Sequence, residues 1–273
     1  MKKSTNALLN APYAVWSAIF VVVPLFIVVV YAFTDAEGHF SFDSILALKD
    51  YGHNFLISLL YSLVATVITL IIAYPFAYAL SKTNEKTQRI QMMLVMLPMW
   101  MNLLIRTYSW MNILDQNGII NQLLMTLGLK PATFLGTPGA VIFGMVYNYL
   151  PYMILPIYTV MAKMDNSLVE AARDLGCNGF NVWRRLILPL SMPGVISGIT
   201  MVFVPSVSTF YISQKLGNGK IMLIGDTIER QMQTLNNYNL GAALSLVLMV
   251  LILVSMFIMN RFADNSGEGG LVA

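Results

Sequence analysis

The sequence predicts an all-α integral membrane protein with six transmembrane helices. Hydrophobic residues make up 57% of the 273 residues and charged residues only 11%, whereas a soluble globular domain carries about 25% charged residues. Too few charges remain to coat a water-exposed surface, and disorder is excluded because it requires high charge and low hydrophobicity. The apolar residues form long continuous runs, which indicates helices, because a membrane β-barrel shows short segments of alternating polarity.

Six apolar stretches approach or exceed the length of about 20 residues that crosses a bilayer. The predicted spans are 13–33, 57–80, 91–110, 140–161, 190–213 and 240–260. The run after Met1-Lys2-Lys3 is too long for a signal peptide and lacks a clear A-x-A cleavage site, so we expect an uncleaved first span. The third span is the weakest, because Arg106 lies inside its limits.

Arg106 has two interpretations. It can lie near a helix end and extend its head group to the membrane interface, or it can border a polar pathway.

The prolines within the predicted spans also have two interpretations. Proline frees a backbone carbonyl, which lipid tolerates only where neighbouring groups or water satisfy it. Ordinary kinks in a packed bundle are one interpretation. The other is a solvated path, favoured at Pro205, which precedes Ser206, Ser208, Thr209 and Tyr211.

The distribution of basic residues predicts that both termini are cytoplasmic. The side that holds the termini and the second and fourth loops carries ten basic residues: Lys2, Lys3, Lys82, Lys86, Arg89, Lys163, Arg173, Arg184, Arg185 and Arg261. The opposite side carries five: Lys49, Lys130, Lys215, Lys220 and Arg230. Cytoplasmic loops are enriched in Lys and Arg, so loop 163–189 should face the cytoplasm.

The loop 163–189 is longer than a simple connector needs. Ser167 and Glu170 have the spacing of a capping box, which predicts a helix start. Gly176 has the place of the glycine that ends such a helix, a second short segment follows, and Pro189 opens the fifth span, where proline costs least. The pattern indicates two short helices at the membrane face, which either join two spans or dock another protein.

The residues of this loop resemble the signature loop of permease subunits of bacterial ABC importers. The motif comprises Glu170, Ala171, Ala172, Arg173, Asp174, Leu175 and Gly176, followed after nine residues by Leu186-Ile-Leu-Pro189. Leu186 replaces the usual isoleucine. The segments 98–108, 170–192 and 223–226 are similar to the spermidine/putrescine permeases, specifically to the first of the two permease subunits of that system.

This resemblance implies a type I importer permease in the cytoplasmic membrane. It also implies partners: a pair of ATPase subunits that bind ATP and Mg²⁺, a second permease subunit, and an extracytoplasmic substrate-binding protein that delivers a polyamine. Glu170–Gly176 would then be the coupling helix held in a cleft of the ATPase.

The sequence offers no site for catalysis or for a metal. Gly217-Asn-Gly-Lys220 is followed by Ile221 and does not satisfy the phosphate-binding loop pattern. His39 and His53 have no ligand spacing to each other or to Cys177. We therefore expect a non-enzymatic subunit that holds no cofactor and takes its energy from a partner.

No Asp or Glu lies inside a predicted span, which argues against a proton- or sodium-coupled secondary carrier, although carbonyl-coordinated sodium remains an alternative. An importer for another solute, such as ferric iron or an oxyanion, is also open. For a cationic substrate, aromatic faces offer cation–π attraction. The candidate substrate-path residues are Trp100, Asn102, Tyr108, Tyr147, Ser208 and Tyr211; packing is the alternative role of the aromatic ones.

Overall fold

The computed structural model describes residues 12–13, 15–35 and 37–268. Within these residues the secondary structure is helical, apart from one isolated bridge between Thr34 and Phe40. The chain divides into two compact units, each described by itself below. Unit 1 contains Met1–Phe55 and Thr227–Leu251, and unit 2 contains Leu56–Asp226 and Ile252–Ala273.

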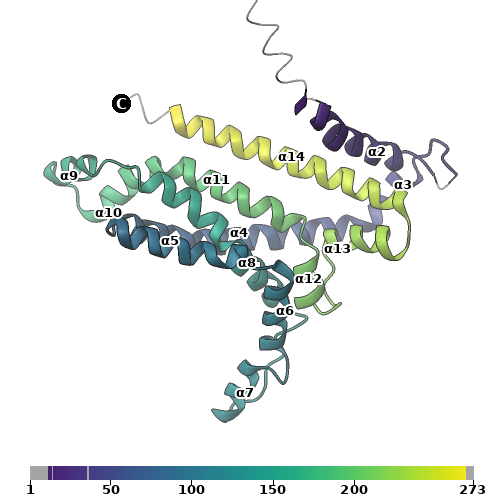
Figure 1. The fold of residues 1–273 in the computed structure, drawn as a ribbon, viewed down its shortest axis with the longest axis horizontal. Coiled ribbons are helices and arrows are strands. Elements are labelled where there is room, and N and C mark those ends of the chain that lie inside the picture. Colours follow the sequence, from purple (N-terminus) through teal and green to yellow (C-terminus); the bar gives the residue numbers. More distant parts are fainter. Residues whose placement is uncertain (1–11, 14, 36, 269–273) are drawn as a thin grey trace, which may run out of the picture. The chain divides into compact units, whose positions relative to one another are not determined.

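Helices occur along the whole described part of the chain (Figure 1). In chain order they are η1 (Ala18–Val22), α2 (Val23–Ala32), α3 (Asp43–Leu46), η2 (Ala47–Tyr51), α4 (Gly52–Ser81), α5 (Glu85–Trp100), α6 (Leu103–Leu114), α7 (Ile119–Thr126), α8 (Pro138–Met161), α9 (Asn166–Asp174), α10 (Gly179–Val182), η3 (Trp183–Ile187), α11 (Leu188–Val207), α12 (Tyr211–Leu216), α13 (Ile224–Glu229), η4 (Arg230–Thr234) and α14 (Tyr238–Glu268).

Five helical segments are long and apolar enough to cross a membrane: Val15–Ala32, Asp43–Ser81, Pro138–Met161, Gly179–Val207 and Tyr238–Met259. A sixth span results if the pair Glu85–Trp100 and Leu103–Thr126, which is bent by 90°, is counted as one. The prediction of an all-helical membrane protein with about six spans is therefore confirmed.

The third predicted span, 91–110, is wrong as a single helix. α5 contains Pro98 and ends at Trp100, after which Met101 is extended. The side chain of Asn102 then accepts a hydrogen bond of 2.7 Å from the backbone N–H of Leu104 and caps the start of α6. The break follows because an N-cap residue has non-helical backbone angles.

The fifth predicted span, 190–213, is displaced. The apolar helical segment runs from Gly179 to Val207 without a break, and Ser208 is the residue at the end of α11. Tyr211 begins α12, a separate short helix. The polar stripe therefore lies at and beyond the end of the span, because the polar residues leave the helix where its apolar sequence stops.

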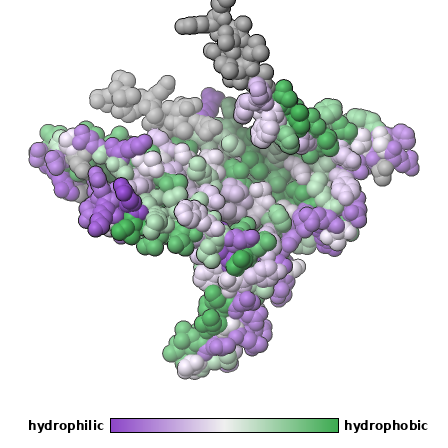
Figure 2. All heavy atoms as spheres, in the orientation of Figure 1, coloured by the Kyte–Doolittle hydropathy of each residue, from purple (hydrophilic) through white to green (hydrophobic). Residues whose placement is uncertain are grey.

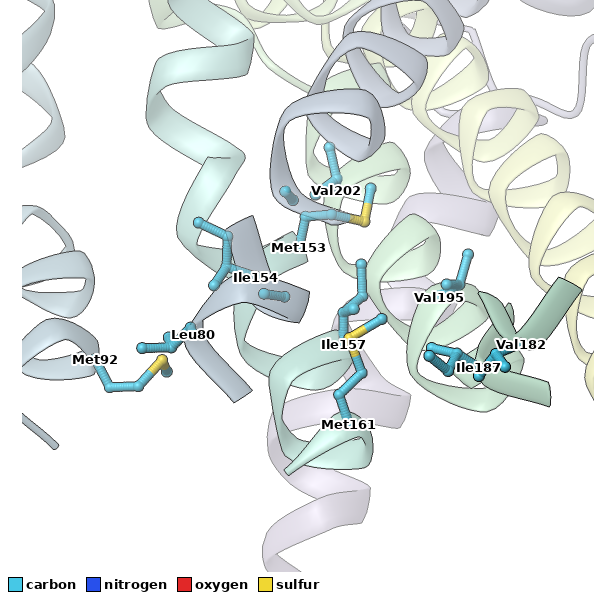
Figure 3. Close-up of a cluster of buried hydrophobic side chains, with 12 residues drawn as sticks. Leu80, Met92, Met153, Ile154, Ile157, Met161, Val182, Ile187, Val195 and Val202 are labelled. Carbon is cyan, nitrogen blue, oxygen red and sulfur yellow. The ribbon is translucent and has the colours of Figure 1, made fainter. Parts of the chain in front are cut away.

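The centre of unit 2 is the packing of α11 against α8. A Cβ on Gly194 would lie 2.8 Å from the carbonyl oxygen of Pro156, and a Cβ on Gly198 would lie 2.6 Å from Sδ of Met153. Small residues at such positions let two membrane helices approach closely. Figure 3 shows the buried side chains around this contact, among them Met153, Ile157 and Val195.

Hydrogen bonds between side chains join further helices of unit 2 to this pair. The hydroxyls of Tyr74 in α4 and Ser191 in α11 lie 3.0 Å apart. Tyr158 in α8 donates to Oε1 of Gln88 in α5 at 2.9 Å. These two contacts link α4 to α11 and α5 to α8.

Unit 1 has a small core of its own. Ala32, Ala242 and Ala243 are buried together. The amide of Asn239 donates to the backbone carbonyl oxygens of Thr34 at 2.7 Å and of Tyr31 at 3.1 Å. This amide thereby binds carbonyl oxygens at and just beyond the end of α2, where the helix leaves its last carbonyls without the usual helical partners.

We expect Gly194→Ala to destabilise the protein by about 1–3 kcal/mol, the usual cost of an extra methylene in a packed core. The measurement is the thermal-unfolding midpoint in detergent, which should fall by several degrees. Gly139→Ala is the matched control, because the nearest atom to its Cβ is 3.9 Å away. Equal midpoints for the two variants would contradict the close contact.

Candidate functional site: a helical elbow and an aromatic pair

The predicted coupling segment forms the exposed helix α9 at one end of unit 2, where Figure 2 shows mainly hydrophilic residues. The helix begins at Asn166, and Asp165 is its N-cap, since the carboxylate of Asp165 accepts the backbone N–H of Ser167 at 2.9 Å. The predicted capping box of Ser167 and Glu170 is therefore wrong. Ser167 lies inside the first turn, because the aspartate two residues earlier already caps the helix.

Gly176 ends α9 as the sequence predicts, with φ of +81°. The N–H of Gly176 donates to the carbonyl of Arg173 at 2.8 Å, and the N–H of Cys177 donates to that of Ala172 at 3.1 Å. These two bonds are the Schellman pattern of helix termination. The positive φ explains the glycine, because a Cβ in the left-handed region clashes with the following carbonyl.

The two faces of α9 differ. Val169, Ala172 and the following Cys177 pack against the core of unit 2. The other motif residues, Glu170, Ala171, Arg173, Asp174, Leu175 and Gly176, are exposed. Leu175 is 85% exposed, and a large apolar side chain in that state marks an interaction surface when others lie beside it. Leu168, 46% exposed, lies on the same short helix.

α9, the turn at Gly176 and α10 together form a helical elbow, residues 166–182, which leads directly into η3 and α11. After α9, the side chain of Asn178 accepts the N–H of Asn181 and caps α10, which continues through η3 into α11. α11 has 20 residues and is therefore about 30 Å long. The exposed elbow at one end of α11 is thus separated by the thickness of a hydrocarbon core from α12 beyond its other end (Figure 1).

Two of the candidate path residues meet beyond that other end. The rings of Tyr108 in α6 and Tyr211 in α12 are 6.1 Å apart and nearly perpendicular, at 74°. Nζ of Lys215 lies 5.0 Å from the centroid of Tyr108 and 5.6 Å from that of Tyr211. Each such cation–π contact is worth about 0.5–1 kcal/mol when exposed and about 2 kcal/mol when desolvated. The sequence identified both tyrosines but missed Lys215.

The other candidate path residues lie elsewhere. Trp100 is 84% exposed and lines a cavity of about 410 Å³ with residues of α5 and α8, including Arg89 and Met96. Asn102 caps α6. The ring of Tyr147 packs edge-on against that of Trp110, with 5.2 Å between the two centroids, which agrees with a packing role. Ser208 bonds back to the carbonyl of Val204 at 3.2 Å.

The segment Leu223–Asp226 is buried, although the sequence placed it in an aqueous loop. Ile224 is 0% exposed, and its N–H donates to Oγ of Ser58 at 2.7 Å. A Cβ on Gly225 would lie 2.5 Å from the carbonyl oxygen of Thr209. The start of α13 therefore packs against the backbone of Ser208 and Thr209, just beyond the end of α11, and only glycine fits there.

Two buried charged residues were not expected. Arg106 is 7% exposed and lies in the first turn of α6, and its Nε and Nη1 make no hydrogen bond to the described chain. That its head group reaches the membrane interface stays a prediction. That it borders a polar pathway stays a prediction. Asp226 is 3% exposed, and its carboxylate accepts the N–H of Leu223 at 2.8 Å. In the sequence, Asp226 stood out only as part of segment 223–226, which resembles the spermidine/putrescine permeases.

These features define a class of protein. It is a helical protein with several membrane spans, and an exposed elbow lies at one end of the packed pair α8 and α11. Among the residues that the structure describes, no group of three His, Cys, Asp or Glu is placed to hold a metal ion.

Comparison with known proteins identifies the family. Residues 73–265 match the family described as "Binding-protein-dependent transport system inner membrane component". The chain is 38% identical over 256 residues to the spermidine/putrescine transport system permease protein PotB of Haemophilus influenzae, covering 90% of each chain. It is 35% identical to PotB of Escherichia coli, covering 86% of this chain and 89% of that one. The chain therefore belongs to this family of transport-system membrane components.

Solved structures show the same fold. A chain of a bacterial ABC transporter that imports the acidic polysaccharide alginate superposes with a TM-score of 0.77 at 18% identity, with 96% of each chain covered. A chain of the MetNI methionine ABC transporter superposes with a TM-score of 0.60 at 17% identity, covering 78% of this chain and 94% of that one. The expected ABC importer permease fold is confirmed.

The N-cap of α9 predicts a pH dependence. The hydrogen bond from Ser167 holds the pKa of the Asp165 carboxyl below its usual value. A carboxyl with a lowered folded-state pKa stabilises the helix above its unfolded pKa of about 3.9, and this stabilisation is lost as the pH falls through the folded-state pKa. Amide-exchange protection of α9, corrected for intrinsic rates, should therefore decline below about pH 4.

Asp165→Asn is the control for this measurement. Asparagine caps helices about as well as aspartate but does not titrate, so protection in this variant should stay level over the same pH range. A parallel decline in both proteins would assign the effect to another group.

Proposed function

We propose that this chain is a transmembrane permease subunit of an ATP-driven importer that translocates polyamines, such as spermidine and putrescine, across the cytoplasmic membrane. The subunit performs no covalent chemistry and holds no cofactor. ATP and Mg²⁺ bind to a partner ATPase. The observation that carries the proposal is the similarity along about 90% of the chain to permeases named for spermidine/putrescine transport.

The chemistry of the aromatic pair supports a cationic substrate. Tyr108 and Tyr211 present ring faces to an ammonium group, that of Lys215, at 5.0 and 5.6 Å. A polyamine carries ammonium groups on methylene chains, and aromatic faces attract them without an acidic residue. Each contact is weak, so a path of such groups does not trap the substrate. Trp100, Asn102, Tyr147 and Ser208 are the other proposed path residues.

The exposed elbow supports coupling to an ATPase. In this proposal α9, with Glu170–Gly176, lies in a cleft of a cytoplasmic ATPase dimer, where the exposed Leu168, Ala171 and Leu175 contact the partner. A second permease subunit completes the pathway, and an extracytoplasmic binding protein delivers the polyamine. Both termini are cytoplasmic, which agrees with the excess of basic residues on the side of the elbow.

The helices suggest how motion crosses the membrane. α9 is tied to unit 2 through Val169 and Ala172, and α10 continues without interruption into α11. A displacement of the elbow is therefore transmitted along a stiff helix that packs backbone to backbone on α8. In the proposed mechanism, ATP-driven closure of the ATPase dimer rocks the two permeases between outward- and inward-open states.

Reconstitution tests this function. Liposomes that contain the complete assembly should take up labelled spermidine only with ATP and the binding protein, and this chain alone should take up none under a proton or sodium gradient. An assembly that hydrolyses ATP in response to its binding protein but moves no polyamine would reject the substrate class. Gradient-driven uptake by the chain alone would replace the importer with a secondary carrier.

Gly176→Ala tests the coupling role of the elbow. No atom lies within 4 Å of the added Cβ, so the substitution acts only through the left-handed φ, at a cost of about 1–2 kcal/mol. We expect ATP-driven uptake to fall several-fold and the ATPase to co-purify in smaller yield. Gly179→Ala, also with no atom within 4 Å but with no positive φ, is the matched control. Full uptake in both variants would contradict the role of the elbow.

A further inference from the structure

The aromatic pair of Tyr108 and Tyr211 is already occupied by a cation of the same chain. Nζ of Lys215 lies within 5.0 and 5.6 Å of the two ring centroids. Tyr211 and Lys215 are four residues apart on α12, a spacing that places two side chains on one face of a helix. Tyr108 comes from α6 and forms the second wall. The ammonium group is thus shared by rings from two helices.

The position of Lys215 is fixed by the adjacent face of its helix, which is buried. Ile212 and Leu216 are 0% and 1% exposed. A Cβ on Gly144 of α8 would lie 2.7 Å from a side-chain carbon of Ile212 and 2.4 Å from one of Leu216. α12 is therefore pressed against α8 at a point where only glycine leaves room. Rotation of α12 that would withdraw Lys215 from the rings is opposed by this packing.

The interaction of Lys215 with the rings is not an ion pair. No salt bridge of Lys215 occurs among the residues that the structure describes, and the side chain is half-buried. Its charge is therefore stabilised by the ring faces, by the hydroxyl of Tyr108 and by solvent. Attraction of this strength is reversible, because it rests on ring quadrupoles that any ammonium of similar size can use.

The side chain of lysine is chemically close to the proposed substrate. Four methylenes and a terminal ammonium are the aminobutyl end that putrescine and spermidine carry. We propose that Tyr108 and Tyr211 form a transient site for the terminal ammonium of a polyamine, and that Lys215 occupies this site as a tethered competitor. This inference rests on the proposed function, but it concerns a site that can be measured without transport.

Competition at this site has a functional consequence. Two ammonium groups cannot share the same pair of rings, since like charges repel at this distance. An arriving polyamine displaces Lys215, and the return of Lys215 expels the polyamine. The tethered cation thereby keeps the affinity of the membrane path low and closes the aromatic site between transport cycles.

The first test removes the competitor. Lys215→Met keeps the aliphatic chain and deletes the charge. The purified complete assembly, without ATP or binding protein, should bind labelled spermidine about 3- to 10-fold more tightly, the range expected for cation–π contacts. The gain should vanish in Lys215→Met combined with Tyr211→Leu. Lys220→Met is the matched control: it deletes the same charge at an exposed site and should bind as wild type does.

The second test detects displacement directly. Tetramethylammonium has no N–H group, so it cannot consume an amine-acylating reagent. It should free Lys215 and speed the acylation of that residue, read by peptide mass spectrometry, and leave Lys220 unaffected.

The outcomes separate this inference from the proposed function. If the assembly transports no polyamine but tetramethylammonium still speeds acylation of Lys215, the ammonium site stands and the substrate assignment falls. If uptake is normal while Lys215→Met binds spermidine no more tightly than wild type and Lys215 acylation is unchanged, the tethered competitor is overturned.

Discussion

The close packing of α11 on α8 is the constraint on which the rest of unit 2 depends. Gly194 and Gly198 let the backbone of α11 come within contact distance of Pro156 and Met153. In a membrane no hydrophobic force brings helices together, so close backbone approach and buried hydrogen bonds are what hold them. The same contact makes α11 and α8 one stiff body, with the exposed elbow before α11 and the aromatic pair beyond it.

Some residues of the elbow stabilise its own helix, and the others form an exposed surface. Gly176 reverses the chain after two Schellman bonds, and Asp165 caps the opposite end of α9. Val169 and Ala172 anchor the helix to the core. A short helix of nine residues would be marginal in isolation, so these contacts determine its shape. The remaining motif residues face outward, and among them Leu175 is a large apolar side chain that is 85% exposed.

Much of the fold could be predicted from the sequence, because long charge-free runs admit few structures in lipid. The end of α9 at Gly176 could be predicted as well, since a left-handed residue demands glycine. The breaks could not. Nothing in the hydropathy distinguishes the bend after Trp100 from a continuous span, and Pro98 alone is compatible with a kink. The break between α5 and α6 depends on the side chain of Asn102, which caps the start of α6.

The site was predicted in part, and the missing part depended on contacts distant in sequence. Tyr108 and Tyr211 were singled out as aromatic candidates, but their meeting depends on α6 turning away from α5 and on α12 leaving the span. Lys215 was counted only as a loop charge, because basic residues in loops are normally solvated. Its place between two rings follows from the packing of α12 on Gly144, which no sequence pattern reveals.

The printed contact of the aromatic pair with a cation, Lys215, agrees with the proposed translocation path better than with a storage site. A buried carboxylate would hold a polyamine ammonium by a strong charge-assisted bond, and release would then be slow. Two ring faces supply about 1–4 kcal/mol in total, which is enough to replace part of the hydration of an ammonium and too little to retain it. In the proposed function, an external binding protein selects the substrate, and the membrane path needs only weak contacts with it.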